Sequence, residues 1–99
     1  MGNEKKTFFL KLNPPRPTFA ADMSLEEKEI MQNHVNYWAP LIKDGTVIVL
    51  GPVADPKGVY GIAVVRVDNE DQLNRLINGD PANGLNSYEI YPMRAVTGF

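Results

Sequence analysis

The chain contains a single histidine, His34, and an imidazole is the side chain best suited to acid–base chemistry near neutral pH. Ile30 and Trp38 stand four residues before and after it, so all three fall on one face of a helix. That spacing allows two interpretations, a histidine packed in the core or a general base. Apolar surroundings would keep the ring neutral in both cases, so burial alone does not choose between them.

A carboxylate partner would favour the catalytic interpretation, because it holds one ring nitrogen and leaves the other free for a substrate. Most aspartates of the chain stand at positions typical of turns and helix caps. Asp80 differs, because it follows the second predicted helix, and Pro81 restricts its backbone to an extended conformation. Asp80 is therefore the candidate partner of His34, with a turn residue as the alternative.

Two other features predict contact with a ligand. Arg16 lies in the proline-rich sequence PPRP, and its guanidinium can pair with a substrate carboxylate through two hydrogen bonds. An exposed, solubilising arginine is the alternative. Gly51, at the end of a predicted strand, would let backbone amides approach a bound molecule closely.

Composition excludes several classes of function. The chain has no cysteine and one histidine, which removes disulfides, a thiolate nucleophile and sulfur-ligated metal sites. No glycine-rich phosphate loop and no serine-hydrolase motif is present. A net charge of −2 opposes binding to nucleic acid or to anionic membrane surfaces. A polar start without a signal-peptide pattern predicts a cytoplasmic protein.

Periodicity predicts two helices and four strands in one domain that spans residues 1–99. In chain order we expect a strand at 6–12, a stiff proline-rich loop at 13–23 and a helix that runs from a Ser24/Glu27 capping box to 44. Next come a strand at 46–50, buried on both faces and stopped by Gly51-Pro52, and a strand at 59–67. A short helix capped by Asp68 or Asn69 closes at 79, and a strand at 87–96 comes last. Pro40 should kink the long helix or unwind its end, and Pro92 requires an edge strand or a bulge.

The order βαββαβ predicts an α+β fold of the ferredoxin-like type, with a four-stranded antiparallel sheet and both helices on one face. The hairpin strands are nevertheless apolar on both sides, since Tyr60, Ile62 and Val64 alternate with other apolar residues. An uncovered apolar face of that size is unusual on a monomer. We therefore expect two copies to pack sheet against sheet in a homodimer, which can assemble further.

An ordered set of short motifs on this frame resembles the YCII-related family over residues 8–93. The set comprises His34 in mid-helix, the strand-ending Leu50-Gly51-Pro52, Tyr60-Gly61 and Asp80-Pro81. The resemblance implies a dimeric α/β barrel whose cleft is lined by a histidine and an aspartate, roles that fall on His34 and Asp80. Relatives include a dehydrochlorinase of a chlorinated hydroxyquinol, and muconolactone isomerases share the fold. The proline-rich loop and Trp38-Ala39-Pro40 depart from shorter members, so no single reaction is transferred.

Together these features predict a cofactor-free, metal-free enzyme in which His34, oriented by Asp80, moves a proton on a small anionic or aromatic molecule by elimination or isomerisation. Arg16, Gly51, Pro52 and Trp38 are expected to contact the substrate. The main alternative is a non-catalytic dimer that binds a small ligand or serves as an accessory subunit. A third reading makes His34 an iron ligand in haem-dependent chemistry.

Overall fold

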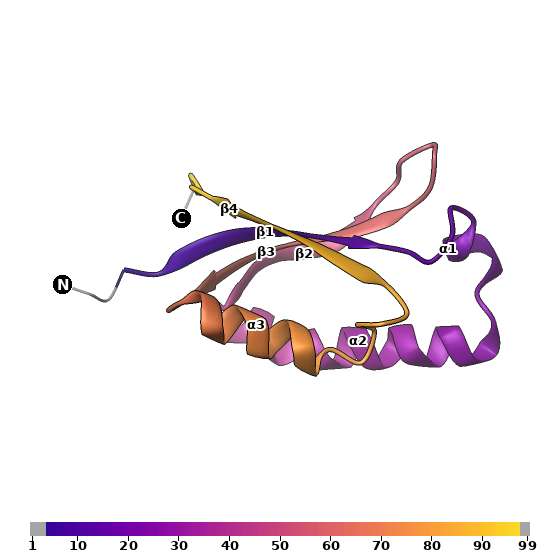
Figure 1. The fold of residues 1–99 in the computed structure, drawn as a ribbon, viewed down its shortest axis with the longest axis horizontal. Helices are drawn as coiled ribbons and strands as arrows, with labels where there is room; N and C mark the ends of the chain where they lie inside the picture. The colour runs from indigo at the N-terminus through magenta and orange to yellow at the C-terminus, as the bar shows by residue number, and fades with distance from the viewer. Residues whose placement is uncertain (1–3, 98–99) are drawn as a thin grey trace.

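The computed structural model describes residues 4–97, and its elements follow the predicted order with one addition (Figure 1). They are β1 (Lys6–Asn13), α1 (Phe19–Asp22), α2 (Leu25–Lys43), β2 (Val47–Val53), β3 (Tyr60–Val67), α3 (Glu70–Gly79) and β4 (Ser87–Met93). The βαββαβ order of the main elements agrees with the order predicted from the hydrophobic periods of the sequence.

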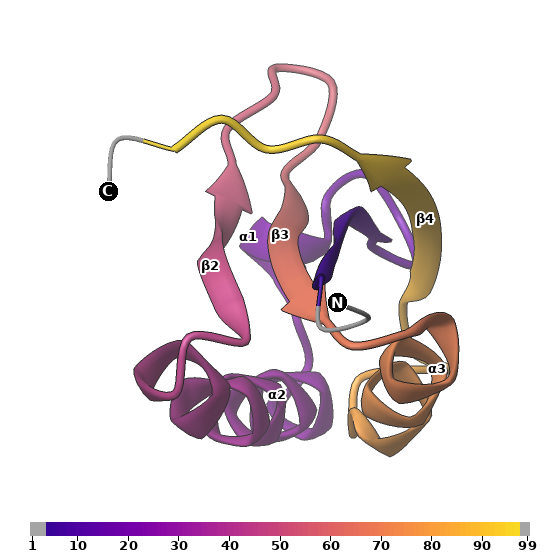
Figure 2. The ribbon, with the colours of Figure 1, turned by 90° about the vertical axis from the view of Figure 1, so that its left-hand side faces the viewer.

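The four strands form one antiparallel sheet in the order β2-β3-β1-β4. Helices α2 and α3 lie side by side under one face of this sheet, as Figure 2 shows. This is the ferredoxin-like arrangement, so the predicted α+β fold class is confirmed. It brings β1 and β3 to the centre and leaves β2 and β4 at the edges.

The core lies between the sheet and the helices. Along β1 every second residue is buried, namely Phe8, Leu10 and Leu12, as the period of two predicted. The central strand β3 contributes Ala63, Val65 and Val67 to the same face, and the helices contribute Trp38 and Leu73, which are fully buried. This layer fixes where α2 and the end of α3 stand relative to each other.

Both long helices begin at the predicted caps. The Ser24 hydroxyl accepts from the Glu27 amide, and the Glu27 carboxylate accepts from the Ser24 amide, which completes the capping box. Asn69 caps α3 by accepting from the Gln72 amide. Helix α2 runs without interruption through Pro40, so the predicted early unwinding is wrong. Pro40 removes one hydrogen bond, the one to the Asn36 carbonyl, and α2 continues past it to Lys43.

The proline-rich segment was predicted to be a loop throughout, and this is wrong for its second half. After the last proline, Pro17, the chain forms the short helix α1, closed by hydrogen bonds from the amides of Ala21 and Asp22 to the Thr18 carbonyl, 2.9 and 3.1 Å long. Figure 1 shows α1 at the end of the sheet opposite the beginning of β1. Phe19 is 5% exposed and anchors this segment.

Strand β2 differs from its prediction in length and burial. Gly51 and Pro52 do not stop it, and it continues to Val53 with Pro52 opposite Gly61 of β3. A proline fits here because β2 is an edge strand, where an amide on the open side has no partner to lose. Within the single chain only one face of β2 is covered, since Val49 is 49% exposed.

Strand β4 forms the other edge of the sheet. It ends at Met93, three residues before the predicted end at 96. The edge position predicted from Pro92 is confirmed, since β4 pairs with β1 on one side only.

The face of the sheet away from the helices carries no covering element in the described part of the chain (Figure 2). Its surface includes Phe9 of β1, Val49 of β2, Val64 of β3 and Tyr91 of β4. The Phe9 and Tyr91 rings pack together, with their centroids 6.3 Å apart. This apolar face is the one from which the sequence predicts a dimer.

Candidate functional site

His34 and Asp80 are in direct contact, as the sequence hypothesis required. The His34 Nδ1 atom lies 2.9 Å from Oδ1 and 2.8 Å from Oδ2 of Asp80. His34 comes from the middle of α2, and Asp80 is the C-cap residue of α3. The two helices pack side by side under the sheet, which brings together residues 46 positions apart.

Asp80 is the most heavily hydrogen-bonded side chain of the site. Besides His34, it accepts from the Trp38 indole Nε1 at 3.0 Å, from the Ala82 amide at 2.9 Å and from the Tyr88 hydroxyl. Burial, which leaves Asp80 only 3% exposed, raises the pKa of its carboxyl, but these hydrogen bonds outweigh it and hold the pKa below the ordinary value. The Asp80 side chain is therefore a fixed carboxylate.

The backbone around Asp80 explains why its side chain turns inward. Asp80 leaves α3 in an extended conformation, at φ −69° and ψ 122°, as expected before Pro81. The Asn83 amide then donates to the Asp80 carbonyl at 3.0 Å and closes a turn. This turn holds the Asp80 carboxylate beside α2, within hydrogen-bonding distance of both His34 and Trp38.

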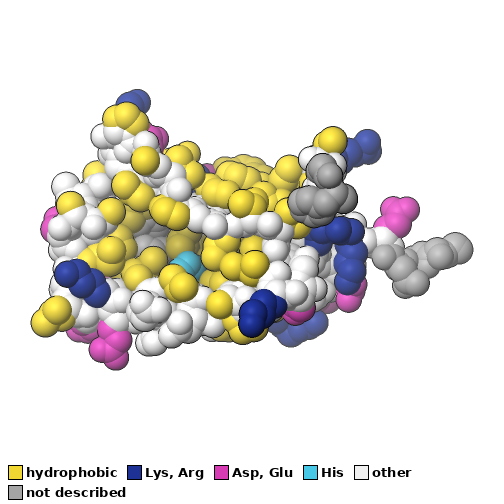
Figure 3. Space-filling model, turned by 180° about the vertical axis from the view of Figure 1, so that it is seen from behind, with side chains coloured by type: hydrophobic (Ala, Val, Ile, Leu, Met, Phe, Trp, Pro, Cys, Tyr) yellow, Lys and Arg dark blue, Asp and Glu magenta, His cyan; other side chains and the backbone are white. Residues whose placement is uncertain are grey.

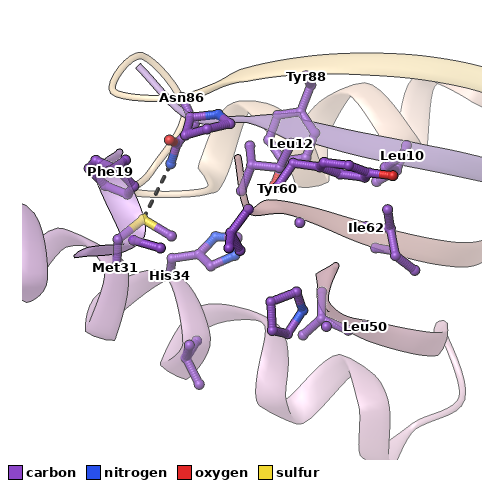
Figure 4. A pocket seen from close by; sticks show the side chains of 18 of the residues that line it. Leu10, Leu12, Phe19, Met31, His34, Leu50, Tyr60, Ile62, Asn86 and Tyr88 are labelled. Atoms are coloured by element: carbon purple, nitrogen blue, oxygen red, sulfur yellow. Dashed lines mark hydrogen bonds between the residues drawn. The ribbon is translucent and has the colours of Figure 1, made fainter. Parts of the chain in front are cut away.

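The second ring nitrogen of His34 is available. No described residue bonds to Nε2, and no buried side-chain nitrogen or oxygen of the described chain lacks a partner, so Nε2 must be exposed. Figure 3 shows the imidazole, in cyan, beside a hollow with a mostly apolar surface. Figure 4 shows the His34 ring reaching from α2 into this hollow. Such a histidine can take a proton at Nε2 while the Asp80 carboxylate stabilises the charge.

The hollow is a cavity of about 410 Å³ between the sheet, α2 and the proline-rich segment. This volume is typical of sites for small molecules. The residues that line it come from β1, α1, α2, β2, β3, the start of β4 and the loops beside these elements. They are Leu10, Leu12, Pro14, Phe19, Ala20, Met23, Met31, His34, Val35, Leu50, Gly51, Pro52, Val59, Tyr60, Gly61, Ile62, Ala63, Asn86 and Tyr88.

The predicted substrate contacts divide into two groups. Gly51 and Pro52 line the cavity, on β2. Trp38 does not line it, because the fully buried indole lies behind Asp80 and donates to its carboxylate. Trp38 thus orients the carboxylate that holds His34.

Arg16 also lies outside the cavity lining. Its guanidinium donates to both carboxylate oxygens of Glu27 at 2.9 and 2.8 Å, and to Asp22 Oδ1 at 2.8 Å. A further bond reaches the Asp22 carbonyl at 3.0 Å. Arg16 ties the proline-rich segment to the start of α2, and this segment covers one side of the cavity through Pro14, Phe19 and Met23.

Sequence reasoning missed two polar residues of the site, Tyr88 and Asn86. Tyr88 pairs with Leu12, so it lies on the helix-facing side of the sheet, and the alternation of β4 carried a signal for that position. Asn86 is 4% exposed and stands in a segment whose composition indicates only turns. Nothing in its local sequence distinguishes it from the exposed Asn83.

Two broader properties of the described chain bear on its class. Within residues 4–97 no group of three or more His, Cys, Asp or Glu side chains could hold a metal ion. No helix in that range is long and apolar enough to cross a membrane.

Comparison with known proteins identifies the family but not a reaction. No curated protein matches the chain. The family model of the YCII-related domain matches residues 7–97, which is nearly the whole sequence. The match includes His34, Asp80 and every residue that lines the cavity. The chain therefore belongs to the YCII-related family.

Proposed function

We propose that the protein is an enzyme that moves a proton on a small molecule and that His34 is its general base. The observation that supports this most strongly is the different environment of the two ring nitrogens. Nδ1 is held by the buried Asp80 carboxylate at 2.8–2.9 Å, whereas Nε2 has no partner in the described chain and opens into the cavity. A merely structural histidine would normally have both nitrogens satisfied inside the protein.

The proposed step requires only the imidazole and the carboxylate. His34 Nε2 takes a proton from a substrate carbon, and the electron pair of the broken C–H bond forms a new double bond. In an elimination a leaving group departs with its own electron pair. In an isomerisation the imidazolium returns the proton at another carbon. Asp80 stabilises the imidazolium during either reaction, and Tyr88 and Trp38 keep Asp80 in place.

The proposal is tested by proton exchange, which does not require knowledge of the product. Small carbon acids, anionic and aromatic, are incubated with the protein in D₂O, and deuterium incorporation is followed by ¹H NMR. His34→Asn should lower the exchange rate by about 10²- to 10⁴-fold, because the general base is lost. Asn33→Ala, an exposed substitution beside it on α2, should leave the rate unchanged.

Exchange that is equally fast in His34→Asn would contradict the role of His34. Saturable binding of these compounds without any exchange would instead support the alternative function, a non-catalytic protein that binds a small ligand. Circular dichroism of each variant shows that the fold is retained.

We also propose that two copies pair through the uncovered sheet face. Its apolar side chains, among them Val49 at 49% and Tyr91 at 48% exposure, support this arrangement. Light scattering should give twice the 11.0 kDa mass of the chain. In Tyr91→Glu the measured mass should fall to that of a single chain. A single-chain mass for the unsubstituted protein at micromolar concentration would contradict the dimer.

A further inference from the structure

Among residues 4–97, no charged side chain lines the cavity beside His34. The lining that these residues form contains no Lys, Arg, Asp or Glu, and its polar side chains are His34, Asn86, Tyr60 and Tyr88. The Tyr88 hydroxyl is already bonded to Asp80. Two cations that do not belong to the lining lie against its rings: the Lys11 Nζ atom is 4.5 Å from the centroid of the Tyr60 ring, and the Arg16 guanidinium is 5.3 Å from the centroid of the Phe19 ring.

Such a lining selects against an anion. A carboxylate or phosphate that entered would lose water and gain no cationic partner, which is costly in an apolar site. Apolar surface from Leu12, Phe19 and Leu50 would instead favour an uncharged, largely apolar molecule. Arg16, the guanidinium that could have changed this balance, is occupied by Glu27 and Asp22 outside the cavity.

Asn86 has hydrogen-bonding capacity that the protein does not use. Its side chain is in a residue only 4% exposed, and its amide Nδ2 contacts the Met31 Sδ atom at 3.2 Å (Figure 4). A thioether is a weak acceptor. The Oδ1 atom has no partner in the described chain, and since no buried polar side-chain atom there is left unsatisfied, it must be exposed. Asn86 also lines the cavity, which places its side-chain amide within reach of a bound molecule.

The backbone holds Asn86 firmly. The Asn86 amide donates to the Ala82 carbonyl at 3.0 Å, and the Asn86 carbonyl accepts from the Gly84 amide at 3.0 Å. The same loop carries Asp80, whose carboxylate accepts from the Ala82 amide. One rigid segment thus sets both the carboxylate behind His34 and the amide inside the cavity.

We propose that the cavity binds an uncharged, largely apolar compound whose polar group is hydrogen-bonded by the Asn86 side chain. Asn86 is then a ligand-binding residue that discriminates a hydroxyl or carbonyl compound from a hydrocarbon of the same shape. This inference rests on the proposed function only for the placement of the ligand next to His34.

Isothermal titration calorimetry with three probes of one shape tests the inference, namely 2-naphthol, naphthalene and 2-naphthoate near neutral pH. We expect 2-naphthol to bind at least tenfold more tightly than 2-naphthoate, because only the anion must be buried with its charge. Asn86→Leu, which keeps the branching of the side chain but removes its polar atoms, should weaken 2-naphthol binding about three- to tenfold more than naphthalene binding. Asn83→Leu is the matched control, since Asn83 stands in the same loop outside the cavity lining.

Two further variants separate a binding role from a structural one. Met31→Leu removes the weak acceptor of the Asn86 amide, and because Met31 also lines the cavity, its effect is measured as the ratio of 2-naphthol affinity to naphthalene affinity. This ratio should stay equal or rise, whereas a purely structural Asn86–Met31 contact predicts that it falls. Ala20→Phe, at an exposed residue that lines the cavity, should weaken all uncharged probes, and Ala21→Phe on the same short helix should not.

Tighter binding of 2-naphthoate, or equal losses of 2-naphthol and naphthalene in Asn86→Leu, would overturn the inference. These outcomes are independent of catalysis. If 2-naphthol binds as expected and no compound exchanges protons, the binding inference stands and the proposed enzyme function fails.

Discussion

Two hydrogen-bonded clusters of this molecule are built from similar groups but differ in what they leave free. Around Asp80, three side chains and one backbone amide converge on a buried carboxylate. Around Arg16, two carboxylates and one carbonyl surround an exposed guanidinium. The first cluster leaves one acid–base atom, His34 Nε2, facing a cavity, whereas the second uses its donors within the protein.

This difference explains why residue type alone did not locate the whole site. Histidine and arginine were both reasonable candidates for chemistry, and both are hydrogen-bonded to carboxylates. Only His34 combines a fixed orientation with an available atom and a space for a ligand. A candidate catalytic group is therefore better judged by its unused hydrogen-bonding capacity than by its charge.

The largest difference between the two clusters is expected when one carboxylate of each is neutralised. Asp80→Asn should lower the rate of proton exchange about 10²- to 10⁴-fold, because an amide no longer stabilises the imidazolium and can favour the wrong tautomer. Asp22→Asn, the matched substitution in the Arg16 cluster, should have little effect on that rate. Similar losses in both variants, measured by ¹H NMR in D₂O, would remove the distinction between the clusters.

A smaller effect is expected when one donor to Asp80 is removed. Burial raises the pKa of Asp80 and the hydrogen bonds lower it, so Tyr88→Phe should let this pKa rise. The loss of a hydrogen bond to a charged group should cost about 1–3 kcal/mol of unfolding free energy near neutral pH.

The pH dependence of that loss follows from linkage. A carboxyl with a lowered folded pKa contributes stability that is present above its ordinary pKa, about 3.9, and is lost as pH falls through the folded value. The difference between Tyr88→Phe and the unsubstituted protein should therefore shrink in acid. Urea unfolding at about pH 7 and about pH 3 measures it, and a difference independent of pH would mean that Tyr88 acts through packing instead.

The smallest effect is expected in the Arg16 cluster. The hydrogen bond from Arg16, followed by that from the Ser24 amide, lowers the pKa of Glu27 from 4.5 to about 2. Its stabilising contribution should be present above pH 4.5 and lost as pH falls to about 2. Arg16→Gln should lower the melting temperature slightly at neutral pH and less in acid, with proton exchange unchanged. A large loss of exchange would instead restore Arg16 as a direct substrate contact.

Much of the frame was predictable because it depends on local patterns. The alternation of β1, the capping box at Ser24 and the edge position required by Pro92 each follow from one short segment. The His34–Asp80 contact was a hypothesis from the sequence, with a turn residue as the alternative for Asp80; the order of elements placed α2 and α3 under the same face, and the structure shows the contact. The catalytic role of this pair stays a prediction.

The rest of the site depends on tertiary contacts that no short segment encodes. Trp38 was expected to touch the substrate, and only the packing of α2 against the end of α3 turns its indole to Asp80. Arg16 is occupied because α1 brings Asp22 beside the start of α2, and α1 was not predicted. Asn86 is a candidate ligand-binding residue only because the tertiary structure places it in the cavity lining.

The protonation pattern of His34 tests the central claim most directly and needs no substrate. The chain has one histidine, so a ¹H–¹⁵N long-range correlation spectrum reports this ring alone. In the neutral ring, recorded where the spectrum no longer changes as the pH is raised, we predict the proton on Nδ1, donated to Asp80, and a bare Nε2. In Asp80→Asn that preference should weaken. A proton found on Nε2 in the unsubstituted protein would contradict the account, because the atom facing the cavity could then not accept a proton from a substrate.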